Sequence, residues 1–210
     1  MVNLNGHFTR CALLLLLLTT LNWRTSTAGP VLAPALSAEK CAQCSSLFGN
    51  LLINITTLLK SGDICYAIPS DAVLIHNAET LQACAPTVTQ QSGCMMQRDS
   101  PFSESECMKN IMKDLSHYDA AIESYLTQPR RNAVNETELL RSTQEMIKSL
   151  MKHCSLDGGS GSSEWDAAPL WGNNTFDNRQ VMCKMMKGFH IRAITINRAM
   201  GYISSGDHRK

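Results

Sequence analysis

Four long stretches of this sequence carry apolar residues at spacings of three and four positions, the pattern of a helix with one buried face. They span residues 41–60, 103–126, 135–151 and 177–203, and no alternating strand pattern lies between them. The link between the second and third stretches is short, whereas the first and last links are long enough for crossover connections. We therefore predict an all-α fold, an up-up-down-down four-helix bundle with two long crossover loops.

Local signals mark the ends of the expected helices. Gly62 follows the first stretch, and glycine commonly ends a helix. Ser103 and Glu106 have the spacing of a capping box, in which each side chain satisfies a backbone N–H of the first turn. Pro129 ends the second helix because proline cannot continue one. Within the first long link, residues 78–83 are expected to form a short helical turn.

The last stretch has two faces that both carry apolar residues. One is a core stripe, made of Met182, Met185, Met186, Phe189, Ala193, Ile196, Met200 and Ile203. The opposite face carries Ile191, Ile194, Thr195, Arg198 and Tyr202. A face that meets only water should be polar, whereas tyrosine and arginine beside aliphatic residues match the composition of protein–protein hot spots. We interpret this second face as a protein-binding surface. The alternative is a helix buried all round, with Arg198 paired inside its own bundle.

The N-terminal segment has the features of a secretory signal. Arg10 precedes an apolar run that contains Leu13–Leu18, and the small residues Ser26–Ala28 offer a cleavage site. We expect a signal peptide at 1–28, a flexible arm at 29–40, a four-helix domain at 41–205 and a C-terminal tail at 206–210. The apolar run is too short to span a membrane, and no later stretch is long enough.

Cysteines and glycosylation motifs agree with secretion. Nine cysteines minus Cys11 of the signal leave eight, an even number that favours disulfides in a secreted chain. Three Asn-X-Thr motifs, at Asn54, Asn135 and Asn173, are expected glycosylation sites. Together with the signal segment, they predict a secreted, extracellular protein stapled by disulfides.

Charge and motif content exclude several other classes. A formal net charge of +1 argues against a nucleic-acid binder. Cys41 and Cys44 form a CxxC that lacks the strand–helix context of a redox motif and the second ligand pair of a zinc site. The histidines match no catalytic motif, and we expect His117 and His190 at helix surfaces or boundaries. We predict no enzyme activity, no metal and no cofactor. A saposin-like lipid-binding protein also begins with CxxC, but such domains are much shorter.

Three runs of the sequence resemble the interleukin-12 alpha family. They are Phe189–Tyr202, Cys107–Tyr118 and Leu81–Pro86. The resemblance implies a long-chain helical cytokine that pairs with a soluble-receptor-like beta chain and, as a heterodimer, clusters cell-surface receptors in immune regulation. It also implies that Arg198 enters a pocket on the beta chain. A helical cytokine that acts alone is the alternative.

Trp165 and Trp171 in the last loop either contact a receptor or cap the core.

The resemblance further implies a set of disulfides. These are Cys65–Cys183 and Cys84–Cys107, with Cys94 bonded to Cys44 or Cys41. We take Cys44–Cys94, which leaves Cys41–Cys154 as a fourth bridge. Mammalian members of the family carry an additional cysteine, between the positions of Cys84 and Cys94, that bonds to the beta chain. This chain has no counterpart unless Cys94 takes that role, so we expect a heterodimer without an interchain disulfide.

Overall fold

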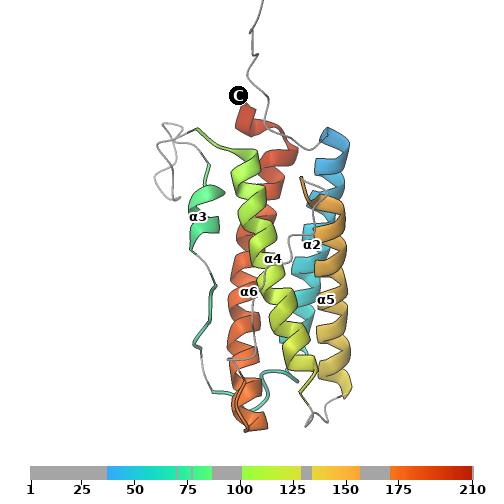
Figure 1. Cartoon of the computed structure of the whole chain (residues 1–210), viewed down its shortest axis with the longest axis vertical. Helices are drawn as coiled ribbons and strands as arrows, with labels where there is room; N and C mark the ends of the chain where they lie inside the picture. Colours follow the sequence, from blue (N-terminus) through green and yellow to red (C-terminus); the bar gives the residue numbers. More distant parts are fainter. Residues whose placement is uncertain are drawn as a thin grey trace, which may run out of the picture. The chain divides into compact units, whose positions relative to one another are not determined.

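The computed structural model describes residues 37–69, 71–76, 78–86, 101–128, 134–156 and 171–209 (Figure 1). In these residues the regular structure is helical. The elements are α2 (Ala38–Lys60), α3 (Glu79–Ala83), α4 (Glu104–Leu126), α5 (Val134–Cys154), α6 (Thr175–Ser204) and the 3₁₀ helix η2 (Asp207–Arg209). The all-α prediction is confirmed. The expected signal peptide, Cys94, Trp165 and most of the expected N-terminal arm lie outside the described residues.

Side-chain caps fix where three of the long helices begin. Ser37 Oγ accepts a hydrogen bond from the Lys40 N–H at 3.3 Å, and Ser103 Oγ accepts one from Glu106 N–H at 3.2 Å. Asn174 caps α6 in the same way. The Ser103 cap is the one that the sequence predicts. The cap at Ser37 starts α2 three residues before the predicted Cys41, so the expected arm at 29–40 ends earlier than predicted.

Contacts between helix ends define the topology. The disulfide Cys44–Cys154 joins the first turns of α2 to the end of α5, so these two helices are antiparallel. At the other end of α2, Cys65 is bonded to Cys183 in the early part of α6. Glu104 at the start of α4 contacts His208 of η2, which follows α6. Helices α2 and α4 therefore run one way, and α5 and α6 run the other (Figure 1). This is the predicted up-up-down-down bundle.

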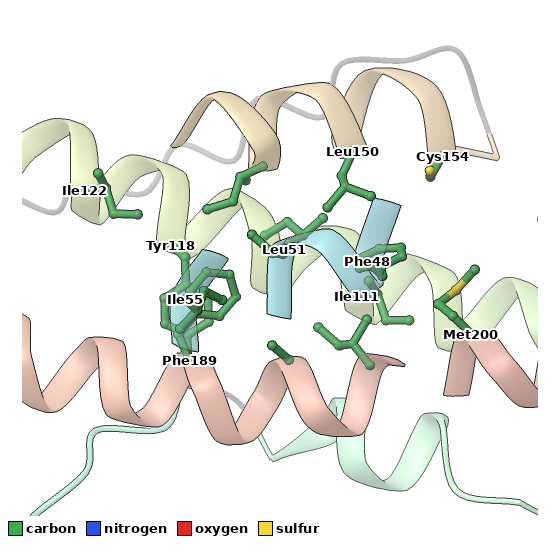
Figure 2. Packing of buried hydrophobic residues seen from close by; sticks show 14 of the residues in the cluster. Phe48, Leu51, Ile55, Ile111, Tyr118, Ile122, Leu150, Cys154, Phe189 and Met200 are labelled. Atoms are coloured by element: carbon green, nitrogen blue, oxygen red, sulfur yellow. The ribbon is translucent and has the colours of Figure 1, made fainter. Parts of the chain in front are cut away.

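The core lies between the four long helices, where each contributes its apolar stripe (Figure 2). At its centre Phe48 and Leu51 of α2 are fully buried, and the Tyr118 and Phe189 rings of α4 and α6 stack with centroids 3.9 Å apart. All eight residues of the predicted α6 core stripe are buried. Each buried side chain of this size contributes about 1.5–3 kcal/mol relative to exposure, so the stripes are the main driving force for the fold.

The disulfides correct one part of the expected pairing. Cys65–Cys183 and Cys84–Cys107 are present as the family resemblance implied. Cys44, however, is bonded to Cys154, so the expected pairs Cys44–Cys94 and Cys41–Cys154 are both wrong. The two candidates are three residues apart, which places them about 60° apart around α2. Cys44 faces α5, whereas Cys41 Sγ lies 4.0 Å from Glu104 Oε1 at the start of α4.

Candidate partner-binding face

The outer face of α6 is the candidate binding surface, and the structure places the five predicted residues on or beside it. Arg198 is exposed, and its guanidinium makes no ion pair with any described residue. Ile191, one of the large exposed hydrophobic side chains, is 44% exposed. Ile194 and Thr195 are half-buried, and the Thr195 hydroxyl donates a hydrogen bond to the Ile191 carbonyl at 3.4 Å. The buried alternative for Arg198 is wrong.

Tyr202 has a different role from its four neighbours. Its ring is half-buried and meets Phe102, just before α4, edge to face with centroids 5.2 Å apart. His208 of η2 lies beside both rings and contacts Glu104 at 3.4 Å. Tyr202 therefore packs the C-terminal end of α6 onto the start of α4, and residues 207–209 of the expected tail form η2 there. Any partner surface includes only the exposed part of this ring.

An extended segment, residues 71–76, borders the α6 face; we call it the strap. Figure 1 shows the chain before α3 running along the side of the bundle. The Leu74 N–H donates a hydrogen bond to the Lys184 carbonyl at 3.0 Å. Close approach is possible because residue 188 is glycine: a Cβ there would lie 1.8 Å from the Leu74 oxygen. Side chains of Val73, Leu74 and Ile75 are partly exposed and add apolar surface to this flank.

A buried ion pair between α4 and α6 lies next to the strap and is hydrogen-bonded to it. Arg192 of α6 is 1% exposed, and its Nε lies 3.1 Å from Oδ2 of Asp114 in α4, which is fully buried. The same guanidinium donates from Nη2 to the His76 carbonyl at 2.9 Å. Burial raises the pKa of Asp114 to about 6, while the neighbouring Thr80 side chain and the charge on Arg192 act in the opposite direction. One buried cation thus joins α4, α6 and the strap.

Two histidines, one from the strap and one from α4, stack near this ion pair. The rings of His76 and His117 are nearly parallel, with centroids 3.6 Å apart. Burial lowers the pKa of His117 to about 4, helped by its neighbour His76. It also lowers the pKa of His76, with Lys113 and Arg192 acting in the same direction. His117 is only 5% exposed, so the expected surface position is wrong; His190 is half-buried, as expected for a helix boundary.

The other predicted positions are less uniform. Asn54 is half-buried between α2 and α5: its amide nitrogen donates to Ser142 Oγ at 3.1 Å, and its oxygen accepts from Thr143 Oγ1 at 2.6 Å. This arrangement disfavours a glycan on Asn54. Asn173 is exposed just before α6, and the side chain of Asn135 lies outside the described residues.

Trp171 packs against the core at the end of α4. Its indole N–H donates to Ser124 Oγ at 2.9 Å, and its ring lies 5.0 Å from that of Tyr125. The ring is half-buried, so the core-capping interpretation describes most of its surface. A partner can reach only the remainder.

No group of three or more His, Cys, Asp or Glu side chains among the described residues is placed to hold a metal ion. Among these same residues, the structure contains no helix that could span a membrane. Two features of the described residues stand out. One is the outer face of α6, and the other is the buried polar cluster of Arg192, Asp114, His76 and His117 next to the strap.

The sequence reasoning missed that buried cluster. Arg192 falls at the edge of the α6 core stripe, next to Ala193, and Asp114 falls in the α4 stripe between Ile111 and Tyr118. Opposite charges inside two core stripes are a signal of a buried pair, since a buried charge requires a partner. A glycine inside a helical pattern, here Gly188, is a second signal, because it marks close backbone approach.

Comparison with known proteins identifies the family. The interleukin-12 alpha subunit family model matches residues 57–206. The chain is 24% identical over 199 residues to interleukin-12 subunit alpha of Marmota monax, covering 82% of this chain and 85% of that protein. It is also 24% identical over 208 residues to interleukin-12 subunit alpha of Lama glama, covering 86% of each. The matched region contains all of α4, α5 and α6, including the candidate face. The chain therefore belongs to the interleukin-12 alpha subunit family of helical cytokines.

Proposed function

We propose that this chain is a secreted cytokine subunit that pairs with a soluble-receptor-like beta chain through the outer face of α6. The observation that carries the proposal is that Arg198 and Ile191, two turns apart on one side of α6, are both exposed while the opposite face is buried. Arginine bordered by aliphatic side chains is the composition of an interface hot spot. Signalling then follows from clustering of receptors by the heterodimer, and it requires no catalysis.

The cysteines support pairing without an interchain disulfide. Among the described residues, three bridges occupy six of the eight cysteines that follow the signal segment. Cys41 is 2% exposed, so a second chain cannot reach its sulfur without local unfolding. Cys94 lies outside the described residues. We expect the co-expressed pair to separate into two bands on non-reducing electrophoresis, and a single covalent band contradicts this part of the proposal.

The binding test is co-secretion of this chain with a tagged beta chain, followed by measurement of the dissociation constant. Replacing Arg198 with Ala should weaken binding by about 30-fold or more, which corresponds to a hot-spot loss of at least ~2 kcal/mol. Arg141→Ala is the matched control, because Arg141 is exposed on α5, away from α6. Both variants should keep the helicity and thermal stability of the parent chain, because neither arginine belongs to the core.

Two results overturn the proposal. Equal affinity of the Arg198→Ala and Arg141→Ala variants removes Arg198 from the interface. Receptor activation by the chain secreted alone, at the potency of the co-secreted pair, shows that no beta chain is needed and supports a cytokine that acts by itself.

A further inference from the structure

The strap is attached to the bundle at points that lie close together. Its backbone N–H at Leu74 bonds to Lys184, and its carbonyl at His76 accepts from Arg192. The His76 ring stacks on His117 of α4. The first two contacts do not depend on pH over the mildly acidic range, because their donors are a backbone amide and an arginine. The third involves two imidazoles, which titrate there.

We propose that the strap is an acid-sensitive latch: it is docked on α4 and α6 while His76 and His117 are neutral, and it is released when these imidazoles take up protons. The stacked rings are 3.6 Å apart, so a proton on one opposes a proton on the other. A proton on His76 also adds a positive charge near Arg192, which is itself buried. Release of the strap removes these repulsions together, because the His76 ring moves away with it.

The groups that face the two imidazoles come from three helices. Lys113 of α4, Glu79 of α3 and Arg192 of α6 act on His76, and Tyr118 of α4 contacts the His117 ring. Asp114 of α4 is paired with Arg192. Lys113 and Arg192 disfavour a charged His76, whereas Glu79 favours it. Glu79 also forms an exposed ion pair with Lys113 at 3.3 Å, which reduces the net effect of both. Burial and the Arg192 cation therefore outweigh the single carboxylate on α3.

The sign of the pH effect follows from the pKa directions. A histidine whose pKa is lower in the docked state contributes full stability above its ordinary pKa, near 6.5, and loses it as the pH falls towards the docked value. For His117 that window runs from about 6.5 to about 4. Asp114 acts the other way, because its pKa of about 6 is raised, so it favours the docked state as the pH falls below 6. The two imidazoles therefore act without opposition between pH 7 and about 6, and below pH 6 Asp114 offsets part of their effect without reversing it.

The test is the protection factor of the Leu74 amide in the intact chain, measured by hydrogen exchange at pH 7.5 and 5.5 and corrected for the intrinsic exchange rate. We expect protection to fall about three- to tenfold at pH 5.5, since one imidazole supplies about tenfold and Asp114 offsets part of it. Core amides of α2 should keep their protection. This readout needs no beta chain, so it is independent of the proposed function.

Variants assign the effect to the latch. His117→Phe keeps a ring for stacking but removes a titrating group, so its Leu74 protection should depend much less on pH. His76→Phe makes the same test on the half-exposed strap, where folding is not at risk. His153→Gln is the control, because His153 is exposed on α5, and it should behave like the parent chain. Three results overturn the proposal. The first is a Leu74 protection factor in the parent chain that is the same at pH 7.5 and 5.5, and the second is a drop in both Phe variants as large as in the parent. The third is an equal drop in the protection of the α2 core amides.

Discussion

Gly188 is the position where the structure makes its sharpest stability prediction. An added Cβ would lie 1.8 Å from the Leu74 carbonyl oxygen and 2.6 Å from its carbon, and both of these are backbone atoms. Since ordinary contacts are about 3.5 Å, a Gly188→Ala substitution must move the strap outward by well over ~1 Å. The hydrogen bond from Leu74 to Lys184 and the one from Arg192 to the His76 carbonyl cannot both survive that displacement.

The magnitude follows from those two bonds. A neutral backbone bond is worth about 1 kcal/mol net, and a bond to a charged donor about 1.5–3 kcal/mol. Alanine inside a helix recovers about 1 kcal/mol relative to glycine. We therefore expect the Gly188→Ala variant to lose about 1–3 kcal/mol of unfolding free energy, measured by urea denaturation followed by circular dichroism. Hydrogen exchange should show lost protection at Leu74.

Gly201 supplies the control within the same helix. It is exposed, and among the described residues no atom beyond the surrounding turn of helix lies within 4 Å of an added Cβ. Gly201→Ala should therefore gain up to about 1 kcal/mol from helix propensity alone. If Gly188→Ala gains stability as Gly201→Ala does, with Leu74 still protected, the strap does not lie where the structure places it.

Three further changes test other parts of the fold. Asp114→Ala leaves the buried Arg192 without its counter-charge and should cost about 3–5 kcal/mol in urea denaturation, whereas the double change to apolar residues should cost clearly less. Peptide mapping under non-reducing conditions should recover Cys44 bonded to Cys154, and replacing both with Ala should lower stability by about 2–5 kcal/mol because the bond closes a loop of more than a hundred residues. Ser103→Ala removes the cap of α4 and should cost about 1 kcal/mol, measured in the same way.

Periodicity was sufficient to predict the bundle and its topology. The α6 stripe from Met182 to Ile203 is a property of one helix, and link lengths limit how helices can be connected. The sequence does not decide which of two residues one helical turn apart makes a given contact. Cys41 and Cys44 both fall on the buried side of α2, and only the positions of α4 and α5 distinguish their neighbours. The pairing with Cys154 therefore required the three-dimensional arrangement.

The strap and its polar cluster show a second limit of sequence reasoning. Residues 71–76 have no helical or strand periodicity, so nothing in them predicts where they dock. His117 was expected at the surface because a histidine in an amphipathic helix usually lies at its boundary. It is buried because His76, forty-one positions earlier in the chain, covers it. Contacts of this kind depend on a segment that packs without regular structure.

The two arginines of α6 differ in burial because of their positions around the helix: one is a buried structural charge and the other is exposed. Arg192 and Arg198 are six residues apart, which places them on different sides of the helix. Arg192 faces α4, where Asp114 supplies the counter-charge that a buried guanidinium requires. Arg198 faces away from the bundle and has no carboxylate partner among the described residues. A partner that covers Arg198 must therefore supply hydrogen-bond acceptors of its own, because an apolar surface alone would leave a desolvated cation unpaired. This requirement favours a partner pocket with a carboxylate or carbonyl oxygens at its base. The Arg198→Lys variant tests this expectation. If the acceptors form a planar, bidentate site, lysine should keep the charge but only part of the affinity.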